Sequence, residues 1–132
     1  MKVAAFGLLA FVSAQLAITP FVAPSHTQSQ SAPAQETIRH FFEDDKPVAQ
    51  LCHAGLALAA AGVLDGRRTA AYPDLEPDMR TAGAEFVDGA GVVDGVMVSA
   101  RAWPDHPEWM REFMSLLAER APVEGAKQAV TA

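Results

Sequence analysis

An uncharged segment, residues 47–62, limits the folds open to this chain more than any other feature. The letters PVAQL, residues 47–51, form a short apolar run typical of a buried strand. The letters CHAG then mark a turn, and LALAAA continues as a helix that Gly62 ends, in the position of a left-handed cap. Because that helix carries no charged residue, we expect it to be buried on most sides. The segment predicts a strand–turn–helix unit.

Helices and strands are expected to alternate along the rest of the chain. Residues 36–45 predict a helix with Ile38, Phe41 and Phe42 on one face. Further elements are a strand at 68–72, a helix at 76–82 ended by Gly83, strand-like pieces at 86–87 and 92–93, and a hairpin turn at 94–95 leading into 96–98. This alternation indicates an α/β sheet, in which sites lie at the carboxyl ends of the strands. Cys52 lies at such an end.

The last predicted element is a helix that begins near Asp105. Asp105 and Glu108 have the spacing of a capping box, and Pro107 is tolerated in a first turn. Apolar side chains then recur at helical spacing, and we interpret this stripe as core packing; it comprises Trp109, Phe113, Leu116 and Leu117.

The chain changes character near Glu36. Residues 3–35 contain no Asp, Glu, Lys or Arg; residues 3–23 are almost wholly apolar, and residues 24–35 are rich in Ser, Gln and Pro. We expect 3–23 to be helical or loosely attached and 24–35 to be an irregular linker. Two interpretations of residues 1–23 stay open: a secretory signal or membrane anchor, or an N-terminus created by a shifted reading frame or misplaced start.

Charge and histidine spacing exclude several functions. The 132 residues suffice for one small domain, and 10 basic against 16 acidic residues give a net charge of -6. No Lys/Arg cluster is present for the phosphates of a nucleic acid. The four histidines lack the spacing of metal ligands, and no Gly-rich phosphate loop occurs, so we expect neither a metal nor a nucleotide cofactor.

Cys52 is the single cysteine, so the chain cannot form an internal disulfide. Two interpretations are open: a small buried apolar residue, or a reactive thiol. A position directly before a helix favours the thiolate through the helix dipole, so the second interpretation predicts a thiol pKa below its free value. His53 is then a candidate general base or acid, although adjacent side chains usually point apart.

Residues 46–68, KPVAQLCHAGLALAAAGVLDGRR, resemble the nucleophile region of the ThiJ/PfpI family, part of the class I glutamine-amidotransferase-like superfamily. The resemblance continues in unbroken order through residues 71–73, 78–88, 92–95 and 99–101 and ends on the final helix. It implies a flavodoxin-like three-layer α/β sandwich, with Cys52 as nucleophile and His53 as its partner. It also implies protease-, deglycase- or glyoxalase-like hydrolase or lyase chemistry on a small carbonyl compound or peptide. The resemblance also implies a possible homodimer and a cytoplasmic location. Export or membrane attachment is expected only if residues 1–23 act as a signal.

Two departures from the family pattern affect this prediction. Ala54 stands where the family has Gly, which would crowd a turn that needs a positive φ. Residues 1–35 do not resemble the family's N-terminal part, which supplies first strands, an acidic residue and a Gly-rich loop, and no Glu or Asp precedes Glu36. We therefore expect a partial domain at 36–121, incomplete on its N-terminal side, a flexible tail at 122–132, and impaired activity. The alternative is a non-catalytic interaction or chaperone-like module, or an inert fragment.

Overall fold

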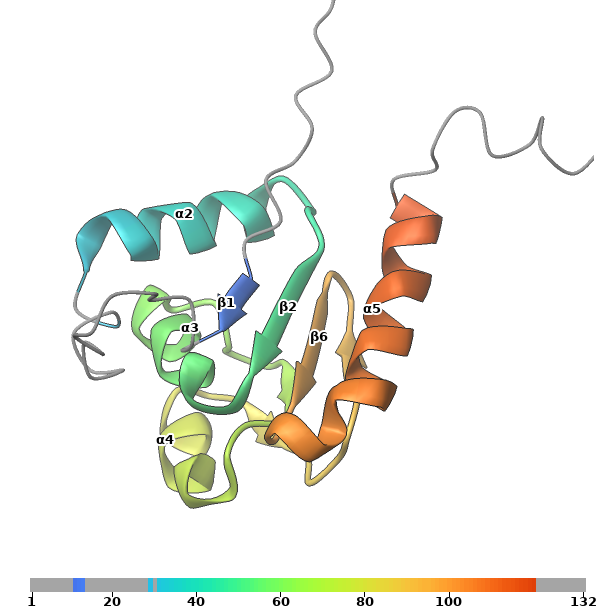
Figure 1. The fold of residues 1–132 in the computed structure, drawn as a ribbon. Helices are drawn as coiled ribbons and strands as arrows, with labels where there is room; N and C mark the ends of the chain where they lie inside the picture. The colour runs from blue at the N-terminus through green and yellow to red at the C-terminus, as the bar shows by residue number, and fades with distance from the viewer. Residues whose placement is uncertain (1–10, 14–28, 30, 121–132) are drawn as a thin grey trace, which may run out of the picture.

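The computed structural model describes residues 11–13, 29 and 31–120. Short strands alternate with helices over these residues (Figure 1). In chain order the elements are β1 (Phe11–Ser13), α2 (Ala32–Glu43), β2 (Val48–Leu51), η1 (Cys52–Ala54), α3 (Gly55–Ala61), β3 (Arg68–Thr69), η2 (Pro73–Leu75), α4 (Glu76–Thr81), β4 (Glu85–Phe86), β5 (Val92–Asp94), β6 (Met97–Ala100), η3 (Trp103–Asp105) and α5 (His106–Arg120), where η marks a 3₁₀ turn.

Strand β2 lies inside a four-stranded sheet of order β1-β2-β6-β5. It pairs in parallel with β1 on one side and with β6 on the other. Strand β5 precedes β6, pairs with it antiparallel, and is joined to it by the turn at Gly95. A second pair, β3 and β4, is also parallel. The parallel register sets Leu51 beside Ala100, so the residues after β2 and β6 emerge at the same edge of the sheet.

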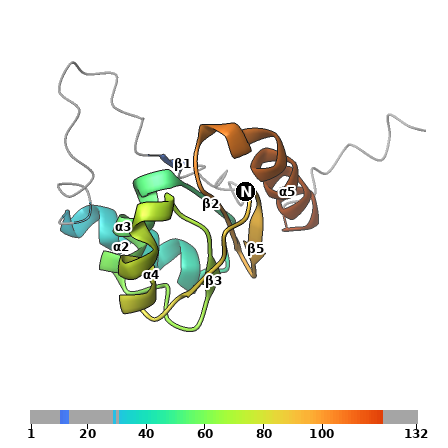
Figure 2. The same cartoon turned by 90° about the horizontal axis from the view of Figure 1, so that it is seen from below.

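Helices cover both faces of the sheet and make three layers. Figures 1 and 2 show α5 on one face and α2, α3 and α4 on the other. Successive side chains of a strand point to opposite faces, so each strand contributes to both layers. Ala49 and Leu51 of β2 pack with Trp109 and Phe113 of α5, whereas Met97 of β6 belongs to the cluster under α3. Burial on both faces explains why β2 and β6 are apolar throughout most of their length.

Most predicted elements from Glu36 onward are confirmed. Gly62 ends α3 with a left-handed φ of 74°, the cap that its position predicted. Gly83 follows α4 with φ 86°, and the Asp94–Gly95 turn joins two antiparallel strands. The stripe on α5 is core, with Trp109, Phe113 and Leu116 buried and Leu117 packed against them. The strand expected at 68–72 is shorter and ends at Thr69.

The N-terminal predictions need two corrections. Residues 11–13 form a strand that pairs with β2, so the expectation of a helical or loose segment is wrong there. Helix α2 begins at Ala32 rather than Glu36, so the expected linker is wrong over 32–35. Pro33 lies in the first turn of α2, where the missing N–H is not needed, which is why a Pro-containing segment starts the helix. Residues 3–10, 14–28 and 30 of the segment lie outside the described residues, as does the tail at 122–132.

No helix within the described ranges is long and apolar enough to cross a membrane.

Replacing Phe113 tests the packing of α5 on the sheet. Phe113 is 2% exposed and touches the β2 and β6 layer, whereas its neighbour Met114 is 55% exposed. We expect Phe113→Ala to lower the free energy of unfolding by about 3–5 kcal/mol, through lost burial and the cavity left behind. Met114→Ala is the matched control and should change it by less than about 0.5 kcal/mol. Chemical denaturation followed by tryptophan fluorescence measures both, and equal effects would contradict this packing.

Candidate active site

Cys52 sits in a left-handed turn at the carboxyl end of β2. The strand ends at Leu51, Cys52 has φ 61°, and the chain then runs through a 3₁₀ turn into α3. A positive φ is uncommon for a residue other than Gly and is associated with functional sites. This geometry confirms the predicted strand–turn–helix position of Cys52. It also resembles the strained turn that exposes a nucleophile at the top of hydrolase sheets.

Ala54 does not crowd this turn. Its φ of -61° and ψ of -21° lie in the ordinary right-handed region, which any residue adopts. The left-handed residue is Cys52, two positions earlier. The condition for a conflict, a positive φ at residue 54, is therefore not met in this turn.

The thiol and the neighbouring imidazole are in contact. Cys52 Sγ lies 3.0 Å from His53 Nδ1, so the turn brings together two side chains that normally point apart. The ring of His53 stacks on Tyr72, with ring centroids 4.8 Å apart and 23° between planes. Sequence reasoning did not single out Tyr72 as a site residue. Its position just beyond β3, at the carboxyl edge of a strand, was the available signal.

Burial raises the pKa of the Cys52 thiol, and a hydrogen bond from the backbone N–H of His53 lowers it by less. The expected lowering below the free value is therefore wrong in this structure. The physical reason is that desolvation of a half-buried thiolate outweighs the turn's one amide donor. Helix α3 begins three residues further on, at Gly55, and has only 7 residues, so its dipole is a weak source of stabilisation.

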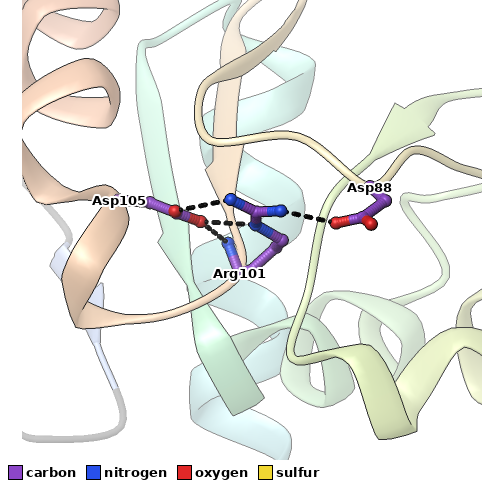
Figure 3. Close-up of polar contacts among 3 residues, drawn as sticks. All are labelled: Asp88, Arg101 and Asp105. Atoms are coloured by element: carbon purple, nitrogen blue, oxygen red, sulfur yellow. Dashed lines mark hydrogen bonds and ion pairs between the residues drawn. The ribbon is translucent and has the colours of Figure 1, made fainter.

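A cluster around Arg101 lies at the same edge of the sheet, directly after β6 (Figure 3). The Arg101 guanidinium donates to both oxygens of Asp105, from Nε at 2.9 Å and Nη2 at 2.9 Å, and its backbone N–H donates to Oδ2 at 3.0 Å. Nη1 donates to Asp88 Oδ1 at 2.7 Å. The cluster ties the end of β6 to the start of α5 and to the loop after β4.

The carboxylate of Asp105 does not form the predicted capping box. Its oxygens accept from Arg101 instead of from an amide in the first turn of α5. Hydrogen bonds from Arg101 lower the pKa of Asp105, and the pKa of Arg101 is raised in turn, first by Asp105 and then by Asp88. Asp105 is 6% exposed, which makes this pairing important, because a buried carboxylate needs a charged partner.

No carboxylate forms a hydrogen bond or ion pair with Cys52 or His53 among the residues that the structure describes. Within the same residues, no group of three or more His, Cys, Asp or Glu side chains is placed to hold a metal ion. The site so far described thus consists of a thiol, an imidazole in contact with it, and a tyrosine ring behind the imidazole.

Comparison with known proteins identifies the family. A sequence profile of the DJ-1/PfpI family matches residues 23–116, and the chain belongs to this family, as the resemblance to ThiJ/PfpI proteins predicted. A protein named deglycase from Pyrococcus abyssi is 48% identical over 84 residues, which are 64% of this chain and 51% of that protein. The deglycase PfpI of Pyrococcus furiosus is 46% identical over 84 residues, with the same coverage of 64% and 51%. The chain therefore spans about half the length of these relatives.

Solved structures show the same fold. A ThiJ/PfpI domain protein from Brachyspira murdochii matches with a TM-score of 0.69 at 19% identity, covering 73% of this chain and 56% of that one. DJ-1beta of Drosophila melanogaster matches with a TM-score of 0.61 at 23% identity, covering 82% of this chain and 59% of that one. The α/β fold class is thereby confirmed.

Alkylation of Cys52 tests the direction of its pKa. Because burial raises the pKa of this thiol, we expect the rate of reaction with iodoacetamide to be low at pH 7. The rate should rise with an inflection above the ordinary thiol value of about 8.5. An inflection well below that value would show that the turn favours the thiolate more than its burial disfavours it. A small thiol such as glutathione under identical conditions is the reference.

The Asp105–Arg101 pair should make stability depend on pH. The folded pKa of Asp105 is lowered, so its contribution is present above its unfolded pKa of about 3.9 and is lost as the pH falls through the folded value. We expect Asp105→Asn to lower the melting temperature at pH 7, and the difference from wild type to shrink below about pH 4. Asp88→Asn is the control: Asp88 is 73% exposed and should contribute little. A pH-independent effect of Asp105→Asn would contradict the pairing.

Proposed function

We propose that this domain carries cysteine-dependent hydrolase or lyase chemistry of the DJ-1/PfpI kind on small carbonyl compounds. The observation that carries the proposal is the left-handed turn at Cys52, which brings Sγ to 3.0 Å from His53 Nδ1 at the carboxyl end of β2. A thiol next to an imidazole is the arrangement that nucleophilic catalysis requires. The deglycase names of the Pyrococcus relatives support the same class of chemistry.

The first step in this proposal is addition of the thiol to an aldehyde carbon. The sulfur–carbon bond forms as the C=O π bond breaks, and the thiol proton passes through His53 to the carbonyl oxygen, which gives a hemithioacetal. His53 acts as base and then as acid, and Tyr72 holds its ring by stacking. With methylglyoxal, the hydrogen on the former aldehyde carbon then moves to the neighbouring ketone carbon, which is reduced to an alcohol while the sulfur-bearing carbon becomes a thioester. Water hydrolyses the thioester, which breaks the sulfur–carbon bond and gives lactic acid and the free thiol.

We propose further that turnover by this chain is impaired. Two observations support this. Burial raises the pKa of Cys52, which reduces the fraction of thiolate at neutral pH. None of the described carboxylates forms a hydrogen bond or ion pair with Cys52 or His53 that would orient them. Nucleophile, base and orienting groups act as a unit, so loss of one reduces the rate steeply.

A second copy of the chain is the proposed macromolecular partner. Trp103 is 75% exposed and lies just beyond β6, at the same edge of the sheet as Cys52. Large exposed aromatic side chains are enriched at protein interfaces, so a homodimer that covers this edge fits the surface. Nucleic acid is not proposed, because the net charge is -6.

Turnover of methylglyoxal, followed as lactate formation, tests the proposed chemistry. We expect a slow rate that falls to background in Cys52→Ser and by about 100-fold in His53→Gln, because general acid–base help is worth at least that factor. Thr69→Val is the control, because the Thr69 hydroxyl is buried and donates to the Ala70 carbonyl, and this variant should keep the wild-type rate. A rate that survives Cys52→Ser would overturn the nucleophile. A rate as high as that of the Pyrococcus relatives would overturn the impairment.

A further inference from the structure

Gln50 is a buried amide in a strand that is otherwise apolar. It lies on β2, two residues before Cys52, and is 0% exposed. Its parallel neighbour on β6 is Ser99, which is also 0% exposed. The alternation of the strand places Gln50 on the face covered by α3, opposite to the face of Ala49 and Leu51. The side chain therefore lies beneath the turn that carries Cys52.

The nitrogen and the oxygen of the Gln50 amide differ in their hydrogen bonding. Nε2 donates a hydrogen bond to the carbonyl oxygen of Cys52 at 3.3 Å. Oε1 has no hydrogen-bond partner within the part of the chain that the structure describes. If the amide oxygen and nitrogen of Gln50 were exchanged, the amide oxygen would face the Cys52 carbonyl oxygen, and neither could donate. The carbonyl acceptor therefore fixes which end of the amide is the nitrogen. A buried polar atom without a partner is rare and costs stability, which makes it a feature that needs an explanation.

The fold leaves room for the amide at this place. A Cβ on Gly55, the first residue of α3, would lie 3.2 Å from Gln50 Nε2 and 3.0 Å from Met79 Sδ. Those distances are shorter than ordinary van der Waals contacts, so any larger residue at position 55 would crowd the amide. The glycine therefore allows α3 to approach Gln50 closely. The amide thus fills a confined space between β2 and α3.

The carbonyl oxygen of Cys52 receives a second donor. The backbone N–H of Tyr72 also donates to it, at 3.3 Å. A trans peptide is planar, and its C=O and N–H point in opposite directions. Fixing the Cys52 oxygen therefore also fixes the direction of the His53 N–H and the left-handed turn from which Cys52 Sγ reaches His53 Nδ1 at 3.0 Å. Donation to the carbonyl also polarises the peptide and strengthens its N–H as a donor.

We propose that Gln50 is a positioning residue for Cys52, and that by holding the carbonyl oxygen of the Cys52–His53 peptide it fixes the direction of the His53 N–H and the turn that places the sulfur beside the His53 ring. The unpartnered Oε1 follows from this role, because the amide is retained for the donor at its other end. The inference rests on the proposed function of Cys52 as nucleophile, since only then does the orientation of its turn affect a reaction. The same N–H is available to an oxyanion that forms beside the sulfur.

Gln50→Met separates this role from simple packing. Met has a similar shape and length but no donor, and it removes the unpartnered oxygen. We expect a melting temperature equal to or above that of wild type, together with an alkylation rate of Cys52 at pH 8 that falls by about threefold or more. The inflection of the alkylation profile should move to higher pH. His53, the titratable side chain in contact with the sulfur, is kept in this variant.

Thr69→Val is the matched control. Thr69 is also 0% exposed and donates to a backbone carbonyl, but to that of Ala70 and not to that of Cys52. It should lose some stability and keep the wild-type alkylation rate and profile. Gln50→Leu is the second variant, in case the Met side chain does not pack, and should show the same slower alkylation in a folded protein judged by circular dichroism.

An alkylation rate and profile of Gln50→Met or Gln50→Leu equal to wild type, in a folded protein, would overturn the positioning role. Failure of the proposed function has a different signature, because methylglyoxal turnover would then survive Cys52→Ser. Alkylation needs no turnover, so the two results are read independently. A slower alkylation in Thr69→Val as large as in Gln50→Met would also overturn the role, since any buried polar residue would then have the same effect.

Discussion

The peptide between Cys52 and His53 is the group on which the site depends. Its carbonyl oxygen accepts from Gln50 and from the backbone of Tyr72, and the two residues that it joins bring Sγ to 3.0 Å from His53 Nδ1. The left-handed φ of Cys52 costs about 1–3 kcal/mol for a residue other than Gly. Such a conformation persists only where the surrounding structure over-determines it. The two donors and the buried strand before it supply that constraint.

The layers of the fold hold this peptide in place. Strand β2 is buried on both faces, by α5 on one side and by α2 and α3 on the other. Its parallel pairing with β6 sets Leu51 beside Ala100, which brings the Arg101 cluster to the edge that carries Cys52. Arg101 then joins the loop after β4 and the start of α5 through Asp88 and Asp105. Packing in the core therefore supports the segment that carries Cys52, and ion pairing at the same edge ties the end of β6 to α5 and to the loop after β4.

Local pattern predicted the turn at Cys52, because an apolar strand, a polar turn and an uncharged helix follow each other within sixteen residues, 47–62. The local pattern did not predict the hydrogen-bond partners of individual polar side chains. In the sequence, Gln50 is a single polar residue within an apolar strand, and nothing there indicates its hydrogen-bond partner. The structure shows that its amide nitrogen donates to the Cys52 carbonyl oxygen. Asp105 had the spacing of a helix cap, but a guanidinium four residues earlier is the stronger partner.

The contrast between local sequence pattern and tertiary packing also explains why the predicted direction of the thiol pKa shift was wrong. A helix after Cys52 predicted stabilisation of the thiolate, whereas the burial that opposes it depends on packing that no local pattern contains. The start of α2 at Ala32 was missed because Pro and Ser letters indicate a linker, although Pro is favoured in a first turn. Residues 11–13 pair with β2 through backbone groups, and their composition carried no signal of that partner.

A crystal structure of the protein tests the central claim most directly. We expect density in which Cys52 has a positive φ, with the Gln50 amide nitrogen on the Cys52 carbonyl oxygen and Sγ close to His53 Nδ1. A Cys52 residue in the extended or right-handed helical region, with Gln50 turned away from its carbonyl, would contradict it.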